Sequence, residues 1–196
     1  MPKAYTPNDK WSRKAKEEGY RARSFYKLKE LDEKFNLTRS GLKVLDLGAA
    51  PGSWLQYTSK KVGKDGKVLG LDLEKIFPVA ENVKTVVCDI TNLEEVEEII
   101  RNLSFENLDL ILSDISPNTS GIKYVDQQRS IQLNQIIFKI AQKYLKSGGV
   151  LVMKVFHGES LFSFRKELER YFPKVIVTKT KVSRERSKEV YLICFN

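Results

Sequence analysis

The sequence contains few of the residues that most often bind metals or form disulfides. Among its 196 residues there are two cysteines and one histidine, and there is no CxxC pair. These counts exclude the usual patterns of a zinc site and of a disulfide framework, so no metal site is expected. Cys88 and Cys194 each lie in an apolar run, which favours buried free thiols in a reducing compartment.

Long hydrophobic runs are also missing. No apolar run approaches the roughly 18 residues of a membrane-spanning helix, and the first residues lack the apolar core of a secretory signal. We therefore expect a cytoplasmic protein with no membrane partner. Hydrophobic residues make up 41% and charged residues 30%, which is typical of a folded globular chain. The length favours a single domain over residues 1–196, which we expect to be monomeric.

Charge is distributed unevenly along the chain. The net charge is +9, with +6 over residues 1–29, −7 over residues 72–109 and +5 over residues 174–188. Basic clusters attract phosphates, and arginines mixed with aromatics, as in residues 20–26, suit phosphates and unstacked bases. A solvated helix face is the alternative for residues 10–16. Four arginines of the two basic segments are predicted to hold a nucleic-acid backbone: Arg21, Arg23, Arg184 and Arg186.

Strand-like and helix-like segments alternate from residue 42 onward. Strands are predicted at residues 43–47, 66–71, 83–87, 108–112, 150–155, 175–180 and 190–195. Helices are predicted at residues 24–35 with Ser24 as the cap, and at 53–62, 93–103, 126–145 and 162–172. This alternation indicates an α/β fold with a mostly parallel sheet. Ligands of such sheets bind beyond the carboxyl ends of the strands.

A glycine loop follows the first predicted strand. It runs from Asp46 through Gly48 and Pro51 to Gly52, and its G-x-x-x-G spacing differs from the G-x-G-x-x-G of dinucleotide-binding folds. The G-K-[ST] of a phosphate-binding loop is also absent, so a nucleoside without phosphates fits better. A purely structural turn is the alternative.

Two aspartates follow the next two predicted strands. Asp72 is placed to accept hydrogen bonds from ribose hydroxyls, and Asp89 from an adenine amine. Together with Asp46 they would favour a cation over an anion. S-adenosylmethionine, which carries a sulfonium and an ammonium on adenosine, therefore fits better than NAD or ATP. A helix cap is the alternative for each aspartate taken alone.

A lysine stands inside the fifth predicted strand. Lys154 follows Val152 and Met153, and lysine is almost never buried without a partner. A buried amine in its neutral form would be a usable base. The alternatives are a lysine that extends to solvent from the strand end and a competing base at His157.

Five motifs in order resemble the FtsJ/RrmJ family of S-adenosylmethionine-dependent RNA ribose 2′-O-methyltransferases, from about Trp11 to Phe195. They are GYRARSFYKL (19–28), DLGAAPGSW (46–54), SDISPN (113–118) followed by SG (120–121), VMKVF (152–156) and SRERSKEVY (183–191). The resemblance implies a Rossmann-like seven-stranded methyltransferase sheet with the last strand antiparallel and helices on both faces. It divides the chain into a basic helical extension (1–40) and a catalytic core (41–196). His157 and Ser53 depart from the common residues, Gln and Gly.

The resemblance also implies the site. The family's catalytic tetrad falls on Lys27, Asp114, Lys154 and Glu189, with Lys154 as our hypothesis for the proton acceptor. Its cofactor contacts fall on Gly52, Trp54, Asp72, Asp89 and Asp114, and we expect Asp46, Gly48 and Pro51 to line the same pocket.

The implied activity is methyl transfer from S-adenosylmethionine to a ribose 2′-hydroxyl of RNA. A uridine of large-subunit (23S-type) rRNA is favoured, because the chain has no extra domains. A tRNA anticodon loop is the main alternative, ahead of an RNA-binding module without catalysis. A small-molecule methyltransferase would not need two basic segments, and the G-x-x-x-G loop disfavours a nicotinamide-dependent oxidoreductase.

Overall fold

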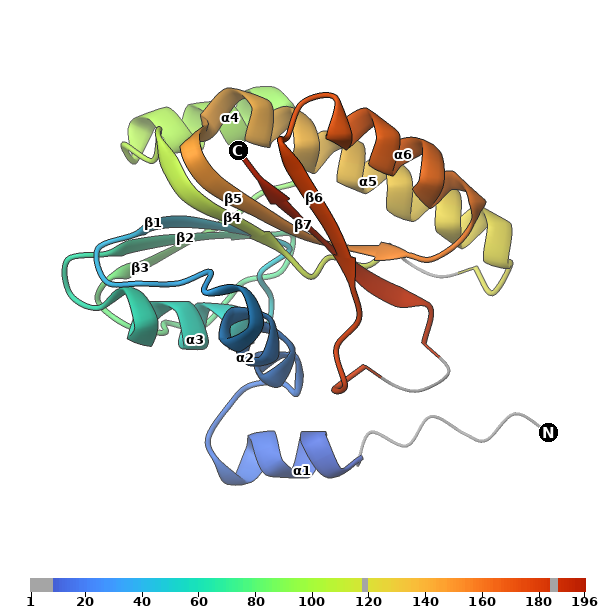
Figure 1. Ribbon diagram of the computed structural model, residues 1–196. Coiled ribbons are helices and arrows are strands. Elements are labelled where there is room, and N and C mark those ends of the chain that lie inside the picture. Colours follow the sequence, from blue (N-terminus) through green and yellow to red (C-terminus); the bar gives the residue numbers. More distant parts are fainter. Residues whose placement is uncertain (1–8, 118–119, 184–186) are drawn as a thin grey trace.

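A seven-stranded sheet forms the centre of the molecule (Figure 1). The computed structural model describes residues 9–117, 120–183 and 187–196. In chain order the strands are β1 (Lys43–Leu47), β2 (Lys67–Asp72), β3 (Val83–Val87), β4 (Leu108–Ser113), β5 (Leu145–Phe156), β6 (Lys174–Thr178) and β7 (Glu189–Phe195). Their spatial order is β3-β2-β1-β4-β5-β7-β6.

The direction of the strands decides which residues meet at the ligand-binding edge. β3, β2, β1, β4 and β5 pair in parallel, whereas β7 runs antiparallel to both β5 and β6. The predicted Rossmann-like sheet with an antiparallel last strand is thus confirmed. Because β7 is reversed, its first residue lies at the same edge as the carboxyl ends of the parallel strands. Phe156 at the end of β5 pairs with Glu189 at the start of β7.

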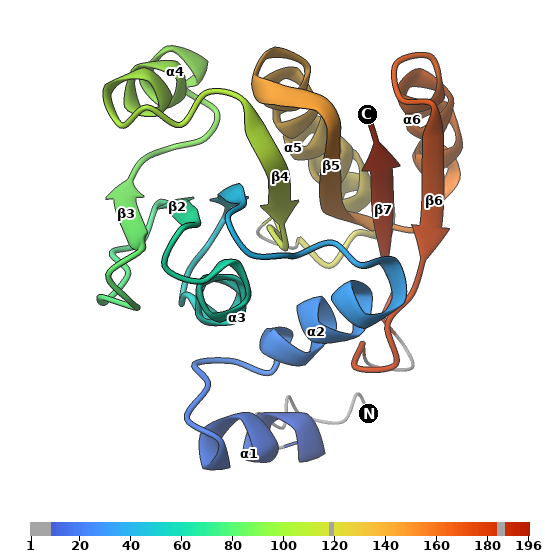
Figure 2. The ribbon, with the colours of Figure 1, turned by 60° about the vertical axis from the view of Figure 1, so that its left-hand side comes forward.

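Helices cover both faces of the sheet (Figures 1 and 2). Helices α4, α5 and α6 lie on one face, α2 and α3 lie on the other, and α1 lies beyond α2. In chain order the helices are α1 (Lys10–Glu17), α2 (Ser24–Phe35), α3 (Ser53–Val62), α4 (Leu93–Asn102), α5 (Lys123–Tyr144) and α6 (Glu159–Glu169). None of the helices in the described parts of the chain combines the length and apolarity needed to cross a membrane.

Each face of the sheet has its own apolar cluster, because successive strand residues point to opposite faces. In β7, Leu192 and Cys194 belong to the cluster that contains residues of α4, α5 and α6, while Tyr191 and Ile193 belong to the cluster that contains residues of α2 and α3. In β5, Met153 belongs to the first of these clusters and Val152 to the second. The alternation therefore places Lys154 and Glu189 on the face that α2 covers.

The expected N-terminal extension is part of this packing. Phe25, Leu28 and Leu31 of α2 are buried in the same cluster as Val44 of β1. Residues 24–35 thus cover the sheet rather than extend from it, and α2 can hold a side chain at the ligand-binding edge.

Several predicted element boundaries were wrong. Ser24 is the first residue of α2 rather than its cap, and its hydroxyl bonds to Ser53 instead, with 2.7 Å between the oxygens. The helices α5 and α6 begin earlier than predicted, and β5 follows α5 directly at Leu145 instead of starting at residue 150. The two glycines before residue 150 do not interrupt the strand, because their backbones exchange hydrogen bonds with Asn196.

Candidate active site

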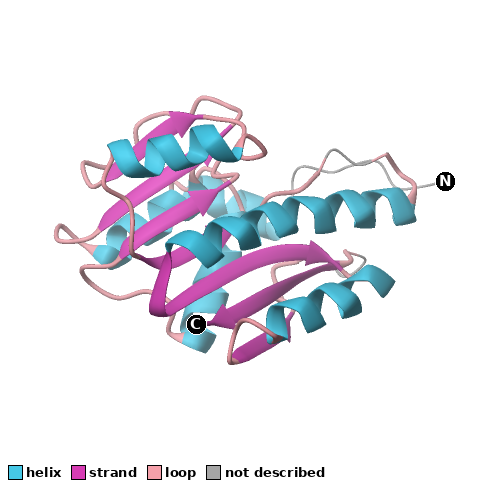
Figure 3. Ribbon diagram, turned by 90° about the horizontal axis from the view of Figure 1, so that it is seen from above, coloured by secondary structure: helices cyan, strands magenta, loops and turns pink. Residues whose placement is uncertain are grey.

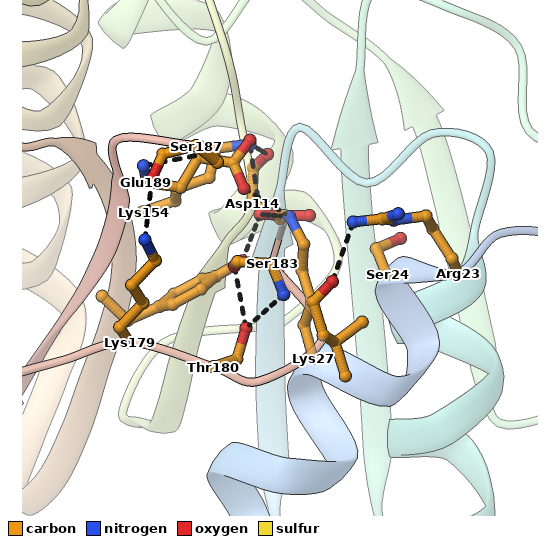
Figure 4. Close-up of polar contacts among 12 residues, drawn as sticks. Arg23, Ser24, Lys27, Asp114, Lys154, Lys179, Thr180, Ser183, Ser187 and Glu189 are labelled. Carbon is orange, nitrogen blue, oxygen red and sulfur yellow. Dashed lines mark hydrogen bonds and ion pairs between the residues drawn. The ribbon is translucent and has the colours of Figure 1, made fainter. Parts of the chain in front are cut away.

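Four charged side chains meet at the carboxyl edge of the sheet (Figure 4). Asp114 follows β4, Lys154 lies near the end of β5, Glu189 begins β7 and Lys27 reaches in from α2. They are the four residues of the predicted tetrad, here called the tetrad, and they are separated by up to 162 positions in the chain. The reversed β7 and the packing of α2 on the sheet bring them together.

The tetrad forms a continuous network of ion pairs. The Lys154 Nζ lies 3.1 Å from Asp114 Oδ1 and donates a hydrogen bond of 2.5 Å to the Asp114 carbonyl oxygen. The Lys27 Nζ lies 3.5 Å from Asp114 Oδ1 and donates to Glu189 Oε2 at 3.1 Å. Two cations and two anions thus balance, so each buried charge has a partner, as burial requires.

The network holds Asp114 in its ionised form. Burial on its own would raise the pKa of this carboxyl, but the charges of Lys154 and Lys27 and the hydrogen bonds from Tyr191 and Lys154 outweigh it and lower the pKa below its usual range. The lysine side chains are 6% and 7% exposed, so little water screens these pairs. Asp114 is therefore a fixed negative charge beside Lys154.

Two positioning residues were missed by the sequence analysis. The Tyr191 hydroxyl donates to Asp114 Oδ1 at 2.7 Å, and burial together with the Asp114 charge raises the pKa of Tyr191, which keeps it a donor. On the other face, Asn134 of α5 donates to the Lys154 carbonyl oxygen at 2.9 Å and so anchors the end of β5. Tyr191 stands two residues after Glu189 in a strand, a spacing that places both on one face; that signal was available.

An acidic cavity of about 520 Å³ adjoins the tetrad. Asp114 lines it together with Gly48 and Pro51 after β1, Asp72 after β2 and Asp89 after β3. Asp72 accepts hydrogen bonds from the backbone of Ala50 at 2.8 Å and of Glu74 at 2.9 Å, so it joins the two loops of the cavity instead of capping a helix. Asp89 accepts from the Thr91 amide and hydroxyl, which lower its pKa.

Two glycines of the loop after β1 sit where a side chain would collide. Gly48 and Gly52 have positive φ angles, and a Cβ on Gly48 would approach Ile115 to 2.8 Å. A Cβ on Gly52 would lie 2.6 Å from the Arg21 guanidinium. The loop therefore needs glycine at both positions to keep its shape beside the cavity.

Three predicted cofactor residues do not line this cavity. Asp46 is buried beneath the loop at 1% exposure, and burial and then the charges of Asp114 and Asp72 raise its pKa. Gly52 is the cap of α3. The Trp54 ring packs on Tyr191 and donates to the Ser24 carbonyl oxygen at 2.8 Å. Trp54 thereby joins α3, α2 and β7 behind the tetrad.

The lining of the cavity fits the group expected there. Its charged residues are all acidic, and among the described lining residues no lysine or arginine is present. Such a lining disfavours phosphates and favours a positively charged nucleoside, which is the chemistry of S-adenosylmethionine.

Comparisons with known proteins agree with this geometry. The family model described as FtsJ-like methyltransferase matches residues 20–196. The chain belongs to the FtsJ-like methyltransferase family. A relative from Azoarcus sp. is 46% identical over 95% of this chain and 90% of its own length, and one from Bdellovibrio bacteriovorus is 40% identical over 96% of each. Both are named ribosomal RNA large subunit methyltransferase E.

Solved structures agree as well. A Plasmodium falciparum chain described as a putative ribosomal RNA methyltransferase is 30% identical, with a TM-score of 0.80 over 90% of this chain and 98% of that one. Fibrillarin from Aeropyrum pernix, solved with natively bound S-adenosylmethionine, is 15% identical with a TM-score of 0.57 over 80% of this chain and 67% of its own. The second likeness is one of fold.

Two of the predicted RNA-binding arginines, Arg21 and Arg23, bond to backbone carbonyl oxygens of the protein itself. The Arg21 guanidinium donates to the carbonyl oxygens of Pro51, Phe77 and Pro78 at 2.7–3.0 Å, and so holds two loops near the acidic cavity. Arg23 donates to the Val182 carbonyl oxygen at 2.8 Å and pairs with Asp9. Arg184 and Arg186 lie outside the described residues.

The competing base is placed apart from the tetrad. His157 is exposed and lines a second cavity beyond the end of β5. Lys154, by contrast, is 5% exposed and contacts Asp114 directly. The geometry thus disfavours His157 as the base and does not support a Lys154 that extends to solvent.

Proposed function

We propose that this methyltransferase transfers the methyl group of S-adenosylmethionine to the 2′-hydroxyl of a uridine ribose in large-subunit rRNA. The observation that carries the proposal is the tetrad beside the acidic cavity, which pairs an ionised aspartate with a buried lysine at the edge where the cofactor would lie. The printed names of the two bacterial relatives supply the class of RNA.

The cavity residues would hold the cofactor by its two ends. Asp72 and Asp89 would accept hydrogen bonds from the adenosine, and the Asp114 charge lies where positive charge is favoured. When bound, S-adenosylmethionine supplies a methyl group already activated by a sulfonium. The protein's remaining tasks are therefore to position the ribose oxygen and to take its proton.

Lys154 is the proton acceptor in this proposal. Lys154 first releases to solvent the proton that it carries as the cationic partner of Asp114. A ribose hydroxyl is a weak nucleophile, and it attacks more readily when the resulting neutral amine, within hydrogen-bond reach, takes its proton. Asp114 and Tyr191 fix the position of the amine through Asp114 Oδ1. Lys27 is paired with Glu189, so its charge holds α2 against β7 beside Lys154.

The basic segments would carry the RNA. Residues 1–29, which include Lys27 of α2, and residues 174–188, which end just before Glu189, carry net charges of +6 and +5, and this positive charge suits a phosphate backbone. We propose that the chain acts as a monomer, as one domain and in the cytoplasm, where large-subunit rRNA is found.

Mapping of ribose methylation tests the proposal. Large-subunit rRNA and tRNA from a strain lacking the gene are compared with RNA from the parent strain, and the purified protein with labelled S-adenosylmethionine is then added back. We expect one rRNA ribose to lose its methyl group and to regain it with wild-type protein but not with Lys154→Ala. Loss of a tRNA methylation instead would make tRNA the substrate. RNA binding without any methyl transfer would leave a non-catalytic module.

A further inference from the structure

A second cavity of about 480 Å³ lies beyond the ends of β5 and β7. Its volume falls within the roughly 300–1,000 Å³ typical of ligand pockets. Tyr124 and Gln127 from the first turns of α5 line it, with Phe156 and Gly158 after Lys154 and with Lys188 before Glu189. Here α5 extends past the strands (Figure 3).

The second cavity begins where β5 and β7 end, next to the tetrad residues on these two strands. Lys154 pairs with Tyr191 across the sheet, and the pair at the end of these strands is Phe156 with Glu189. The next residues outward, His157 and Lys188, share a hydrogen bond of 2.8 Å from amide to carbonyl and line the second cavity. Asp114 lines the acidic cavity, whereas Phe156 and Lys188, which stand close to Lys154 and Glu189 in the chain, line the second, so the tetrad adjoins both cavities.

One polar group in the second cavity has no partner within the described part of the chain. Gln127 is 9% exposed, and its buried Nε2 makes no hydrogen bond there. Its amide lies against Gly158, where a Cβ would approach Nε2 to 2.2 Å. A buried amide donor that lacks a partner costs free energy, which a ligand with an acceptor could recover.

The rest of the lining suits a base more than a phosphate. Tyr124 is 67% exposed, although tyrosine usually buries its ring. The charges of Lys123 and Lys188 are matched in number by Asp126 and Glu159, so the cavity is not an anion site. Asp126 accepts hydrogen bonds from Ser120 and Gly121, which leaves the Glu159 carboxylate as an acceptor for a base.

We propose that this cavity binds the base of a nucleotide next to the target in the same RNA strand. The inference rests on the proposed function. The base stacks on Tyr124, the Glu159 carboxylate accepts from its edge, and the Gln127 side chain turns outward from Gly158 to donate to it. Holding a neighbour on one side of the tetrad fixes the strand, so the target ribose meets Lys154 in register.

Substitution of the stacking residue gives the first test. Tyr124→Ala should lower kcat/KM for unmethylated large-subunit rRNA by about 5- to 150-fold, the range for loss of one base–aromatic stack. Tyr124→Phe should retain most activity, and calorimetry should find S-adenosylmethionine affinity unchanged. The matched control is Phe162→Ala, because Phe162 is 65% exposed on α6 and lines neither cavity. Equal rates for Tyr124→Ala and the control would overturn the proposal.

Removal of the base itself gives the second test. A single-stranded RNA pentamer with a central uridine is compared with pentamers that are abasic on either side of it, by fluorescence anisotropy in the presence of S-adenosylhomocysteine. We expect removal of the base at one of the two positions to weaken binding to wild-type protein by about 5- to 150-fold. The same abasic pentamer should bind the Tyr124→Ala variant as well as the intact pentamer does. Equal losses in both proteins, or no binding of the intact pentamer, would contradict the second site. Methylation of rRNA by wild-type protein would then still support the proposed function.

Discussion

Lys154 illustrates at the scale of a residue how position decides chemistry. It points to the face of the sheet that α2 covers, at 5% exposure, and Asp114 holds it through both a carboxylate and a carbonyl oxygen. A lysine on the opposite face would have entered the apolar cluster under α5, where nothing comparable would balance its charge. The alternation of side chains along β5 thus decides that the Lys154 amine has polar partners instead of being buried without them.

The proposed role of Lys154 predicts the behaviour of two variants. Lys154→Ala and Lys154→Arg should both reduce methyl transfer to background, because a guanidinium stays charged and cannot accept a proton. Cofactor affinity should remain close to wild type, since the amine acts on the incoming hydroxyl. Transfer of labelled methyl groups and calorimetry measure the two quantities. Near-normal turnover with arginine would make Lys154 a positioning charge, and His157→Ala should be far milder than either.

Asp46 predicts a dependence of stability on pH. Its folded pKa is raised, mainly by burial, whereas in the unfolded chain it ionises near pH 3.9. The fold therefore bears no cost from this group below about pH 3.9, and it loses stability as the pH rises toward the folded pKa.

Asp46→Asn should remove that cost. We expect the variant to be more stable than wild type at pH 8, because each unit by which the folded pKa is raised corresponds to about 1.4 kcal/mol of stability that is lost above it. The gain should be smaller at pH 5. Urea unfolding at both pH values measures it, and Asp65→Asn, at an exposed position in the turn before β2, is the control. A gain that does not change with pH would show that Asp46 is not the group that titrates.

At the scale of elements, the placement of α2 depends on polar contacts at both of its ends. Ser24 bonds to Ser53 at the start of α3, and near the other end Asp32 accepts hydrogen bonds from Tyr57 of α3 and from Thr38 after the helix. These contacts fix the two helices to each other on one face of the sheet. Because Lys27 lies between them, the helix pair sets where its amine meets Glu189.

Loss of the Asp32 carboxylate should destabilise the protein. Its oxygens accept three hydrogen bonds of 2.6–2.7 Å at 4% exposure, so Asp32→Ala leaves buried donors without partners. We expect a loss of about 2–4 kcal/mol in the free energy of unfolding. Glu33→Ala is the matched control, since Glu33 is 63% exposed and pairs with Lys29 on the helix surface. Denaturant titration measures the free energy of unfolding of both variants. Similar small losses in the two would mean that apolar packing alone holds α2 in place.

At the scale of the whole molecule, the described parts of the two basic segments, from opposite ends of the chain, contact each other. Arg23 donates a hydrogen bond to the Val182 carbonyl oxygen, and Glu30 accepts one from the Lys181 amide. Lys34 donates to the Thr178 hydroxyl at 3.0 Å. The acidic cavity lies on the other side of Asp114. The net positive charge of these segments suits an RNA strand, as proposed above, and the acidic cavity suits a cationic cofactor.

The two arginines outside the described residues provide a test of that surface. The double variant Arg184→Gln, Arg186→Gln should weaken RNA binding and reduce the slope of log K against log salt by about 0.7–0.9 for each phosphate that is no longer neutralised. Binding of S-adenosylmethionine should not change. Lys64→Gln with Lys67→Gln removes the same charge at the edge of the sheet opposite the tetrad, and it should leave the slope of log K against log salt nearly unchanged. Equal slopes for both double variants would place the RNA elsewhere.

Local pattern was sufficient to predict the order of strands and helices from α2 onward and the mostly parallel sheet, whereas the four residues of the tetrad were named from the family resemblance. Apolar periodicity and glycine turns are properties of neighbouring residues, and they depend little on what the rest of the chain does. The reversed last strand came from the family resemblance, and it explains why Glu189 can reach Lys27.

Tertiary structure alone decided how the polar side chains are used. Arg21 looked like an RNA contact, but its guanidinium binds carbonyl oxygens up to 57 positions away. Trp54 and Asp46 belong to the cofactor motif in sequence, yet they are buried behind the cavity, and the partner of Tyr191 lies 77 positions earlier. A hydrogen bond needs its two atoms within about 3 Å of each other, and only the packing of distant elements determines which atoms meet.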